Sequence, residues 1–114
     1  MKYEVTFDAI AIEDLEPLRA FDRKAILDTI ERVLTTTPTQ LSKSRIKRLR
    51  GLDSPQYRLR VGEFRVFYDV ADHLVYVLRI LSKAAVAKYL QEMGYEAEGN
   101  QRGATRPRNG KNGE

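Results

Sequence analysis

The sequence predicts a single α+β domain in which an N-terminal strand and a helical hairpin pack on an antiparallel sheet, in the order β-α-α-β-β-β-α. Residues 57–61 and 64–70 alternate polar and apolar side chains around Gly62-Glu63, a pair that suits a two-residue hairpin turn. Residues 26–34 place apolar side chains at helical spacing instead. With 114 residues, of which 42% are hydrophobic and 32% charged, the chain has enough apolar surface for one core and too little for a second domain.

The N-terminal segment predicts a strand followed by a helix. Residues 2–7 alternate polar and apolar side chains, as in a half-buried strand. Asp8 is suited to cap a helix that carries Ile12 and Leu15, and Pro17 should end or kink that helix.

A second helix should complete the hairpin. Asp22 is a candidate for its N-cap, and the breaker at residues 35–38 should end it. Its apolar positions at helical spacing are Ile26, Leu27, Ile30, Val33 and Leu34.

The β-hairpin around Gly62-Glu63 has a register that the turn fixes. A two-residue turn pairs Val61 with Phe64, and this register separates the side chains into two faces. The further pairs are Leu59 with Val66, Tyr57 with Tyr68, Arg60 with Arg65 and Arg58 with Phe67. One face of the hairpin is therefore apolar, and the other carries three arginines.

A third strand of this meander is expected at residues 74–81, and its register depends on the preceding loop. A three-residue loop pairs Val66 with Leu78 and sets Arg79 opposite Arg65. A two-residue loop sets Arg79 against Phe64 on the core side and buries a charge, so the three-residue loop is the favoured prediction.

The last element should be a helix capped by Ser82 and stopped by Gly94, with Val86, Leu90 and Met93 facing the core. Residues 96–114 contain no aromatic or branched aliphatic side chain, so their burial cannot offset the entropy of ordering them. We expect a domain over residues 1–95 and a disordered polar tail over residues 96–114.

Positive charge is concentrated in one stretch of the chain. Residues 43–65 hold eight basic and two acidic side chains, whereas residues 1–42 carry a net charge of −3 and residues 66–114 a net charge of +1. Such clustering favours a polyanionic partner. The sequence predicts a basic linker over residues 42–51. Two roles have equal weight for it: a solvated structural segment, or a segment that attracts RNA electrostatically. The candidate nucleic-acid-binding residues are Lys43, Arg45, Lys47, Arg48, Arg50 and Arg79.

Composition also excludes several classes of protein. The chain has no cysteine and one histidine, so disulfides are excluded and a transition-metal site would lack its usual ligands. We expect no metal and no other cofactor. No window approaches the roughly 18 consecutive apolar residues of a membrane span, and the N-terminus lacks a long apolar core. A cytoplasmic protein without a membrane partner is expected.

The run Leu49-Arg50-Gly51-Leu52, followed by residues 57–70, resembles the hallmark stretch of the RelE/ParE superfamily of bacterial toxins. A weaker similarity extends over roughly residues 1–93. The resemblance implies a RelE-like fold and a toxin that is paired with a cognate antitoxin. RelE-like members enter the ribosome and cut mRNA without a metal, by driving the ribose 2′-hydroxyl onto the adjacent phosphate, whereas ParE-like members poison DNA gyrase.

The same resemblance assigns roles to the arginines of the hairpin. Arg65 matches the mid-sheet catalytic arginine of the superfamily. Arg58 and Arg60 stand where RelE-like enzymes carry lysines. Since arginine keeps its proton at any working pH, both can clamp a phosphate but neither can act as the general base.

Toward the C-terminus, the sequence departs from the ribonuclease pattern at one position and leaves the role of another open. The arginine expected after the last strand is replaced by Ala84 or Ala85, and Lys83 is the nearest cation. Lys83 could serve as the base only if the surrounding arginines favour its neutral form. Tyr89 matches the catalytic tyrosine of the superfamily. Two roles have equal weight for it: a functional one, in catalysis or base stacking, and a structural one, in packing beside Leu90.

These residues favour a ribosome-dependent mRNA endoribonuclease, or mRNA interferase, that inhibits translation. Its catalytic candidates are Arg58, Arg60, Arg65, Lys83 and Tyr89. The alternatives are a ParE-like inhibitor of DNA gyrase and a catalytically weak RNA-binding relative.

Overall fold

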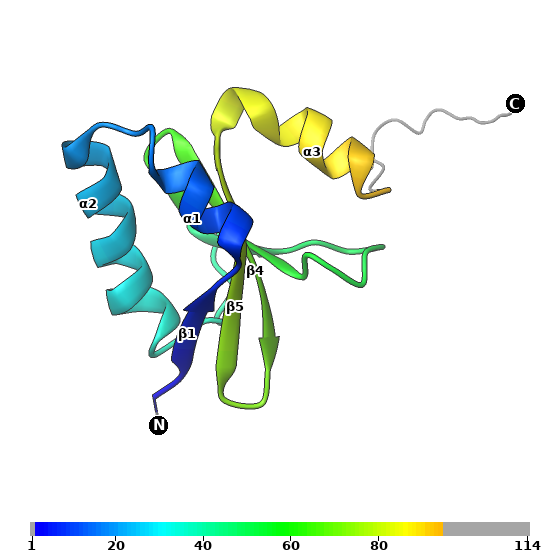
Figure 1. Cartoon of the computed structure of the whole chain (residues 1–114). Coiled ribbons are helices and arrows are strands. Elements are labelled where there is room, and N and C mark those ends of the chain that lie inside the picture. The colour runs from blue at the N-terminus through cyan, green and yellow to red at the C-terminus, as the bar shows by residue number, and fades with distance from the viewer. Residues whose placement is uncertain (1, 95–114) are drawn as a thin grey trace, which may run out of the picture.

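The computed structural model describes residues 2–94 and has the predicted α+β class (Figure 1). Its strands are β1 (Glu4–Phe7), β2 (Ile46–Arg48), β3 (Tyr57–Val61), β4 (Phe64–Ala71) and β5 (Leu74–Ser82). Its helices are α1 (Ala9–Leu15), α2 (Ala20–Thr29) with the π-helical continuation η1 (Ile30–Leu34), the 3₁₀ turn η2 (Lys83–Ala85) and α3 (Val86–Glu92). The predicted domain boundary at residue 95 and the predicted tail at 96–114 lie outside the described residues.

The five strands form one sheet in the order β1-β5-β4-β3-β2. β1 runs parallel to β5, and the other neighbours are antiparallel. The β4–β5 hairpin extends beyond the helices in Figure 1. The sheet is therefore mixed at one edge, where the sequence predicts a purely antiparallel arrangement.

β2 lies within residues 42–51, for which the sequence predicts a linker, so that prediction is wrong at this strand. Its Ile46 pairs with Leu59, Lys47 with Arg58, and Arg48 with Tyr57. Ile46 is only 2% exposed and belongs to the main core, which gives this short basic segment a reason to join the sheet. β2 forms the outer edge of the sheet beside β3.

The β3–β4 hairpin has the predicted register. Val61 faces Phe64, Arg60 faces Arg65 and Arg58 faces Phe67. Gly62 has φ +57°, a left-handed conformation that glycine adopts without steric cost.

β5 follows neither of the two registers considered from the sequence. The loop is the two-residue turn Asp72-His73, and Tyr68 pairs with Val77. A β-bulge then leaves Leu78 without an opposing residue, so that Arg79 faces Phe67. The predicted pairing of Arg79 with Arg65 is wrong, and the bulge is the reason that the short loop does not bury Arg79 in the core.

The helix ends agree in part with the predicted caps. Asp8 is the N-cap of α1 and accepts a hydrogen bond from the Ile10 amide. α2 begins earlier than predicted, after Arg19, so Asp22 lies in its first turn, where a carboxylate favours the positive end of the helix dipole. Ser82 precedes η2 without a capping hydrogen bond from its side chain, and Gly94 follows α3 with φ +93°.

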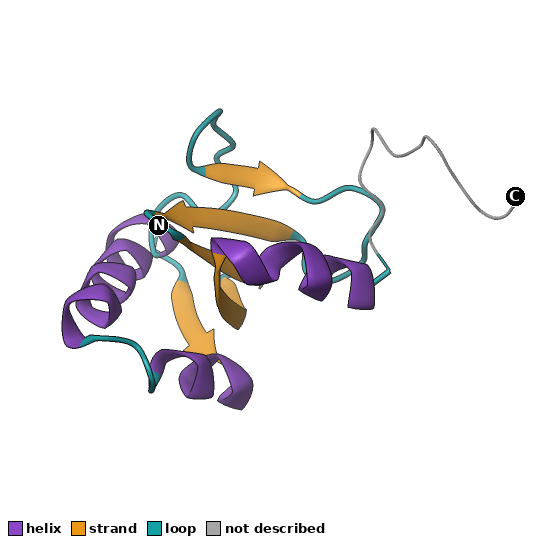
Figure 2. Cartoon of the chain, turned by 90° about the horizontal axis from the view of Figure 1, so that it is seen from above, coloured by secondary structure: helices purple, strands orange, loops and turns teal. Residues whose placement is uncertain are grey.

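The sheet buries side chains on both faces. α1, α2 and η1 cover the first face, where Leu59, Val66 and Tyr68 pack in the larger core. α3 covers the second face with Tyr89, Val86 and Leu90. Beneath α3, the buried side chains of Leu49, Phe67 and Leu81 complete a smaller core. Figures 1 and 2 both show α2 and α3 on different sides of the molecule.

The helices in residues 2–94 are all too short, or too polar, to cross a lipid bilayer.

Candidate functional site

Three arginines lie on the face of the sheet that α3 partly covers, and together Arg58, Arg60 and Arg65 are here called the arginine cluster. Their shared face follows from the β3–β4 register, in which Arg60 lies directly opposite Arg65. Within residues 2–94, no carboxylate comes within 4 Å of these guanidinium groups. The cluster is therefore an uncompensated positive site.

Arg65 is oriented by the turn of its own hairpin. Its side chain is buried, with the whole residue 9% exposed. Its Nη1 donates to the Gly62 and Phe64 carbonyl oxygens, both at 2.9 Å. These two bonds fix the guanidinium plane before any ligand arrives, which is the preorganisation that binding of a developing negative charge requires.

Arg58 has an unmet hydrogen-bonding requirement. Its Nε is buried and has no hydrogen-bond partner among residues 2–94. Burial lowers the pKa of Arg58 most, and the positive charges of Arg65 and Arg60 lower it further. Because an arginine starts from a very high pKa, Arg58 keeps its proton, and an anion beside it would relieve both the repulsion and the unpaired donor.

Arg79 lies on the same face but its charge is already paired. Its Nε and Nη2 donate to the two carboxylate oxygens of Asp14 at 2.8 and 3.1 Å. The hydrogen bond to Asp14 raises the pKa of Arg79. The guanidinium also lies 5.4 Å from the centre of the Tyr89 ring. Arg79 therefore links β5 to α1 and α3, and it is not part of the arginine cluster.

Lys83 and Tyr89 have different surroundings. The exposed Lys83 follows β5, and its amide donates to the Glu63 carbonyl at 2.8 Å, beside the turn that orients Arg65. Tyr89 is 8% exposed, and its ring centre lies 5.1 Å from that of Phe67. Burial is the largest of the effects that raise the pKa of Tyr89. Tyr89 therefore makes the packing contacts that hold α3 on the sheet.

The basic residues of segment 43–50 are all exposed, but they point to different parts of the surface. Lys47 lies opposite Arg58 and extends the arginine cluster toward the sheet edge. Arg48 donates to the Gln56 carbonyl at 2.9 Å and lies 5.1 Å from the centre of the Tyr57 ring. Lys43 and Arg50 lie outside β2, on the segments that lead into and out of it.

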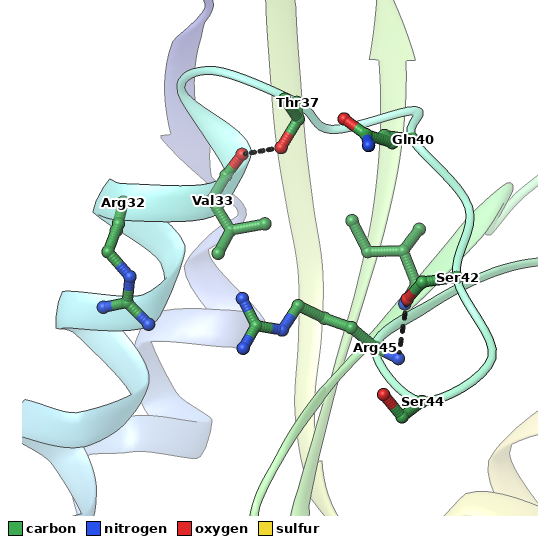
Figure 3. Close-up of a pocket in the computed structure, with 8 residues that line it drawn as sticks. Arg32, Val33, Thr37, Gln40, Ser42, Ser44 and Arg45 are labelled. Carbon is green, nitrogen blue, oxygen red and sulfur yellow. Dashed lines mark hydrogen bonds between the residues drawn. The ribbon is translucent and has the colours of Figure 1, made fainter.

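Arg45 points to the other side of β2, into a surface hollow of about 490 Å³ that it shares with Arg32 (Figure 3). The polar side chains around the hollow are those of Thr37, Gln40, Ser42 and Ser44. Arg32 is not among the candidate residues predicted from the sequence, because nothing in the pattern of the second helix distinguishes it from any exposed arginine. Arg32 and Arg45 line the same hollow only because residues 42–46 approach the end of η1 in the folded chain.

No group of three or more histidine, cysteine, aspartate or glutamate side chains suited to a metal ion occurs among residues 2–94.

Residues 5–86 match the family described as the ParE toxin of the type II toxin–antitoxin system parDE. The chain belongs to the RelE/ParE superfamily of type II toxins. A protein of Methanocaldococcus jannaschii that bears the name toxin RelE1 is 37% identical to this toxin over 84 residues, which are 73% of this chain and 91% of the relative.

Solved structures of the superfamily share the fold of this toxin. The toxin–antitoxin complex RelBE2 of Mycobacterium tuberculosis matches with a TM-score of 0.63 and 25% identity, covering 72% of this chain and 99% of the other. The RelB–RelE antitoxin–toxin complex of Methanococcus jannaschii matches with a TM-score of 0.58 and 25% identity, covering 73% of this chain and 95% of the other. The predicted RelE-like fold is confirmed.

Proposed function

We propose that this toxin is an mRNA interferase, a metal-independent endoribonuclease that cuts mRNA on the ribosome and so inhibits translation. The observation that supports this best is the arginine cluster, in which three guanidinium groups share one face. In the described part of the chain no carboxylate pairs with them, and the buried Arg58 Nε has no hydrogen-bond partner there. Such a site attracts a phosphate group more strongly than a solvated surface does.

The cluster suits the transition state of RNA cleavage by the 2′-hydroxyl. When that hydroxyl gives up its proton and attacks the adjacent phosphorus, the phosphorane that forms carries more negative charge than the substrate phosphate. The bond from phosphorus to the 5′-oxygen then breaks, which leaves a 2′,3′-cyclic phosphate, and the 5′-oxygen takes up a proton as it departs. Arg65, held by the Gly62 and Phe64 carbonyls, would stabilise this extra charge without first having to reorient. Arg58 and Arg60 would clamp the flanking oxygen atoms.

Proton transfer falls to other residues, because the arginines keep their protons. As the general base we propose Lys83, whose backbone amide donates to the Glu63 carbonyl at the hairpin turn, and this role requires that the positive charge of the arginine cluster favour its neutral form. The raised pKa and the burial of Tyr89 support a packing role for that residue over a catalytic one. Lys83→Ala should therefore reduce cleavage far more than it weakens ribosome binding, and equal losses of both would disprove this assignment.

A cognate antitoxin is the proposed protein partner. The solved relatives in Mycobacterium tuberculosis and Methanococcus jannaschii are toxin–antitoxin complexes. Carboxylates of an antitoxin segment laid over the arginine cluster would supply the negative charge that the cluster lacks and would block the phosphate site.

Primer extension on an mRNA incubated with purified ribosomes tests the proposed function. The toxin should produce codon-phased cuts, and Arg65→Ala should slow them by about 10²-fold to 10³-fold, the usual effect of losing one preorganised donor. Lys24→Ala removes one positive charge from α2, far in sequence from the cluster, and should cut like the unaltered toxin. If no cuts appear with ribosomes, this function is disproved.

A second candidate is inhibition of DNA gyrase by protein contact, as in ParE-like toxins. It is favoured by the ParE description of the matching family, by Ala84 or Ala85 in place of a catalytic arginine, and by the burial of Tyr89. Gyrase assayed with plasmid DNA and this toxin would then leave relaxed or cleaved plasmid. A toxin that fails in both assays but binds RNA would be a catalytically weak relative.

A further inference from the structure

We propose that the hollow between η1 and the segment before β2 is a second phosphate-binding site, which holds the backbone of an RNA that also reaches the arginine cluster. This site is called here the edge hollow. The proposal rests on the proposed function only for the choice of RNA as the ligand.

Two guanidinium groups from different elements line the edge hollow. Arg32 lines it from η1 and Arg45 from the bend before β2, and Figure 3 shows Arg45 reaching across toward the helix that carries Arg32. Neither forms an ion pair with a carboxylate of residues 2–94. Because like charges that line one hollow repel each other, an anion between them would be bound by both.

Hydrogen bonds fix the backbone that carries each arginine. At the end of η1, the Thr36 hydroxyl donates to the Arg32 carbonyl at 3.0 Å, and the Thr37 amide donates to the Val33 carbonyl at 2.8 Å. The π-helical geometry of η1 is itself rare and is often found at functional sites. The wall is therefore rigid on the Arg32 side.

The Arg45 side of the hollow is fixed in a similar way. The Ser42 hydroxyl oxygen accepts hydrogen bonds from the amides of Arg45 at 3.0 Å and Ile46 at 3.3 Å. This turn holds the bend from which Arg45 projects toward η1 (Figure 3). Because the backbone that carries its two cations is already fixed, the site loses little backbone entropy when an anion binds.

The size and lining of the hollow fit a nucleotide unit better than an isolated ion. Its volume of about 490 Å³ lies in the range of small-molecule sites. The side chains of Gln40 and Ser44 add polar groups at the rim, and the buried Val33 and Ile46 form an apolar floor. This combination can take a phosphate together with its sugar.

The path of positive charge favours RNA over a single acidic side chain. β2 is the edge strand, with Lys47 on the face of the arginine cluster and Arg45 turned toward the edge hollow. Positive groups therefore continue from Arg58 across the sheet edge to Arg32. Regularly spaced phosphates can occupy several points along such a path.

Titration of ¹⁵N-labelled toxin at low salt tests this proposal directly. Inorganic phosphate and a single-stranded RNA oligonucleotide should each shift the amide signals of residues 42–46 and the Nε–Hε signals of Arg32 and Arg45. Replacing both arginines in the variant Arg32→Ala/Arg45→Ala should remove the shifts of residues 42–46 and leave those of the arginine cluster. Both side chains are exposed, so the variant should keep its fold, which circular dichroism would verify.

The affinity for RNA provides the second readout. Loss of two phosphate contacts should weaken binding about tenfold and reduce the slope of log K against log salt by about 1.4. Lys2→Ala/Lys24→Ala removes the same charge from exposed positions outside the hollow and should have a much smaller effect. Equal losses in the two variants would overturn the proposal, as would shifts confined to the arginine cluster.

The outcome is separable from that of the proposed function. If the toxin cuts mRNA but the edge hollow shows no shifts, only the second site is wrong. If the hollow binds phosphate and RNA but no cuts appear, the second site stands and the endoribonuclease activity is wrong. If the hollow binds a polyglutamate peptide more tightly than RNA, it is a contact for an acidic protein, and the proposal fails.

Discussion

Arg58 is the residue at which stability and function conflict most clearly. Its Nε is buried and finds no hydrogen-bond partner in the part of the chain that the structure describes, and two neighbouring arginines share its face. Burial lowers its pKa, which means that the folded state holds the charged form less favourably than water does. A residue that weakens the free protein in this way is expected where a ligand supplies the missing charge.

Replacing this arginine by an apolar side chain should stabilise the toxin. Arg58→Met keeps the aliphatic packing and removes the unpaired donor and its repulsions, so the free energy of unfolding should rise by about 1 kcal/mol. Urea denaturation measures this change, and phosphate binding at the cluster should be lost in the same variant.

The exposed neighbour Arg60 is the matched control. Arg60→Met removes the same charge from a solvated position and should change the free energy of unfolding by less than about 0.5 kcal/mol. A lower stability in Arg58→Met than in Arg60→Met would contradict this account of Arg58.

At this scale the sequence predicted the shared face of Arg58, Arg60 and Arg65, because strand alternation and the turn at Gly62 are local signals. It did not predict the partner of Arg79. Asp14 lies 65 residues earlier, and no local pattern joins an aspartate of the first helix to the last strand.

Among the elements, β5 depends on α1 to complete its edge. β1 pairs with β5 only as far as Val77, whereas β5 continues to Ser82. Beyond that point Asp14 takes the place of a strand, since its Oδ2 accepts the Ile80 amide at 2.9 Å and also the Nε of Arg79. One carboxylate thus satisfies a strand edge and neutralises a half-buried cation.

Removing this carboxylate should cost more than an ordinary surface ion pair. Asp14→Ala leaves the Ile80 amide and Arg79 without their acceptor and should lower the free energy of unfolding by about 2 kcal/mol. Asp14→Asn keeps one oxygen for the amide and should lose about half as much. Thermal denaturation measures the loss of stability in each variant. Faster hydrogen exchange at the Ile80 amide would show that the loss comes from this strand edge.

A matched control exists on α2. Lys24→Ala breaks the exposed ion pair with Asp28 and should change stability by less than about 0.5 kcal/mol. If Asp14→Ala costs no more than this control, the edge function assigned to Asp14 is wrong.

Neither the strand β2 nor the bulge in the β4–β5 pairing follows from the sequence, and the physical reasons differ. β2 has only three residues, and its one buried side chain, Ile46, is flanked by cations that favour a solvated loop. The bulge in β5 has no local sequence signal, because Leu78 is as good a strand residue as its neighbours. Both features arise from pairing with a strand that is already in place.

Across the whole molecule, the two cores depend on tyrosines that are buried in their neutral form. In the larger core, Tyr68 donates from its hydroxyl to the Pro38 carbonyl at 2.6 Å. Burial raises the pKa of Tyr68 well above its ordinary value of 10.0. In the smaller core, burial also raises the pKa of Tyr89.

This burial predicts an alkaline limit to stability. Because the folded-state pKa of Tyr68 is raised, its stabilising contribution is complete below its ordinary pKa of 10.0 and declines as the pH rises above that value. Tyr68→Phe should lower stability by about 1 kcal/mol at neutral pH, through loss of the hydrogen bond. Between about pH 10 and pH 11, the free energy of unfolding of this variant should fall less steeply with pH than that of the unaltered toxin.

Urea denaturation at several pH values checks this prediction. The alkaline loss of stability that remains in Tyr68→Phe should become smaller when Tyr89→Phe is added, because burial raises the pKa of both tyrosines. An unchanged slope in the double variant would show that other groups set the alkaline limit.

The sequence predicted the fold class and the helical hairpin well, because both follow from periodic patterns. The placement of α3 on the second face and the meeting of Arg32 with Arg45 do not follow from such patterns. Each is decided by packing between segments that are far apart in the chain.

The pairing of β1 with β5 also has a consequence for the time at which the toxin becomes complete during its synthesis. Glu4 pairs with Leu74, so the first strand to leave the ribosome waits for a partner that is made about 70 residues later. Until then, the β3–β4 hairpin can form locally, but the sheet lacks two of its strands. A nascent chain therefore presents its arginine cluster on an unfinished sheet, and a complete toxin appears only when nearly all of the domain has been translated.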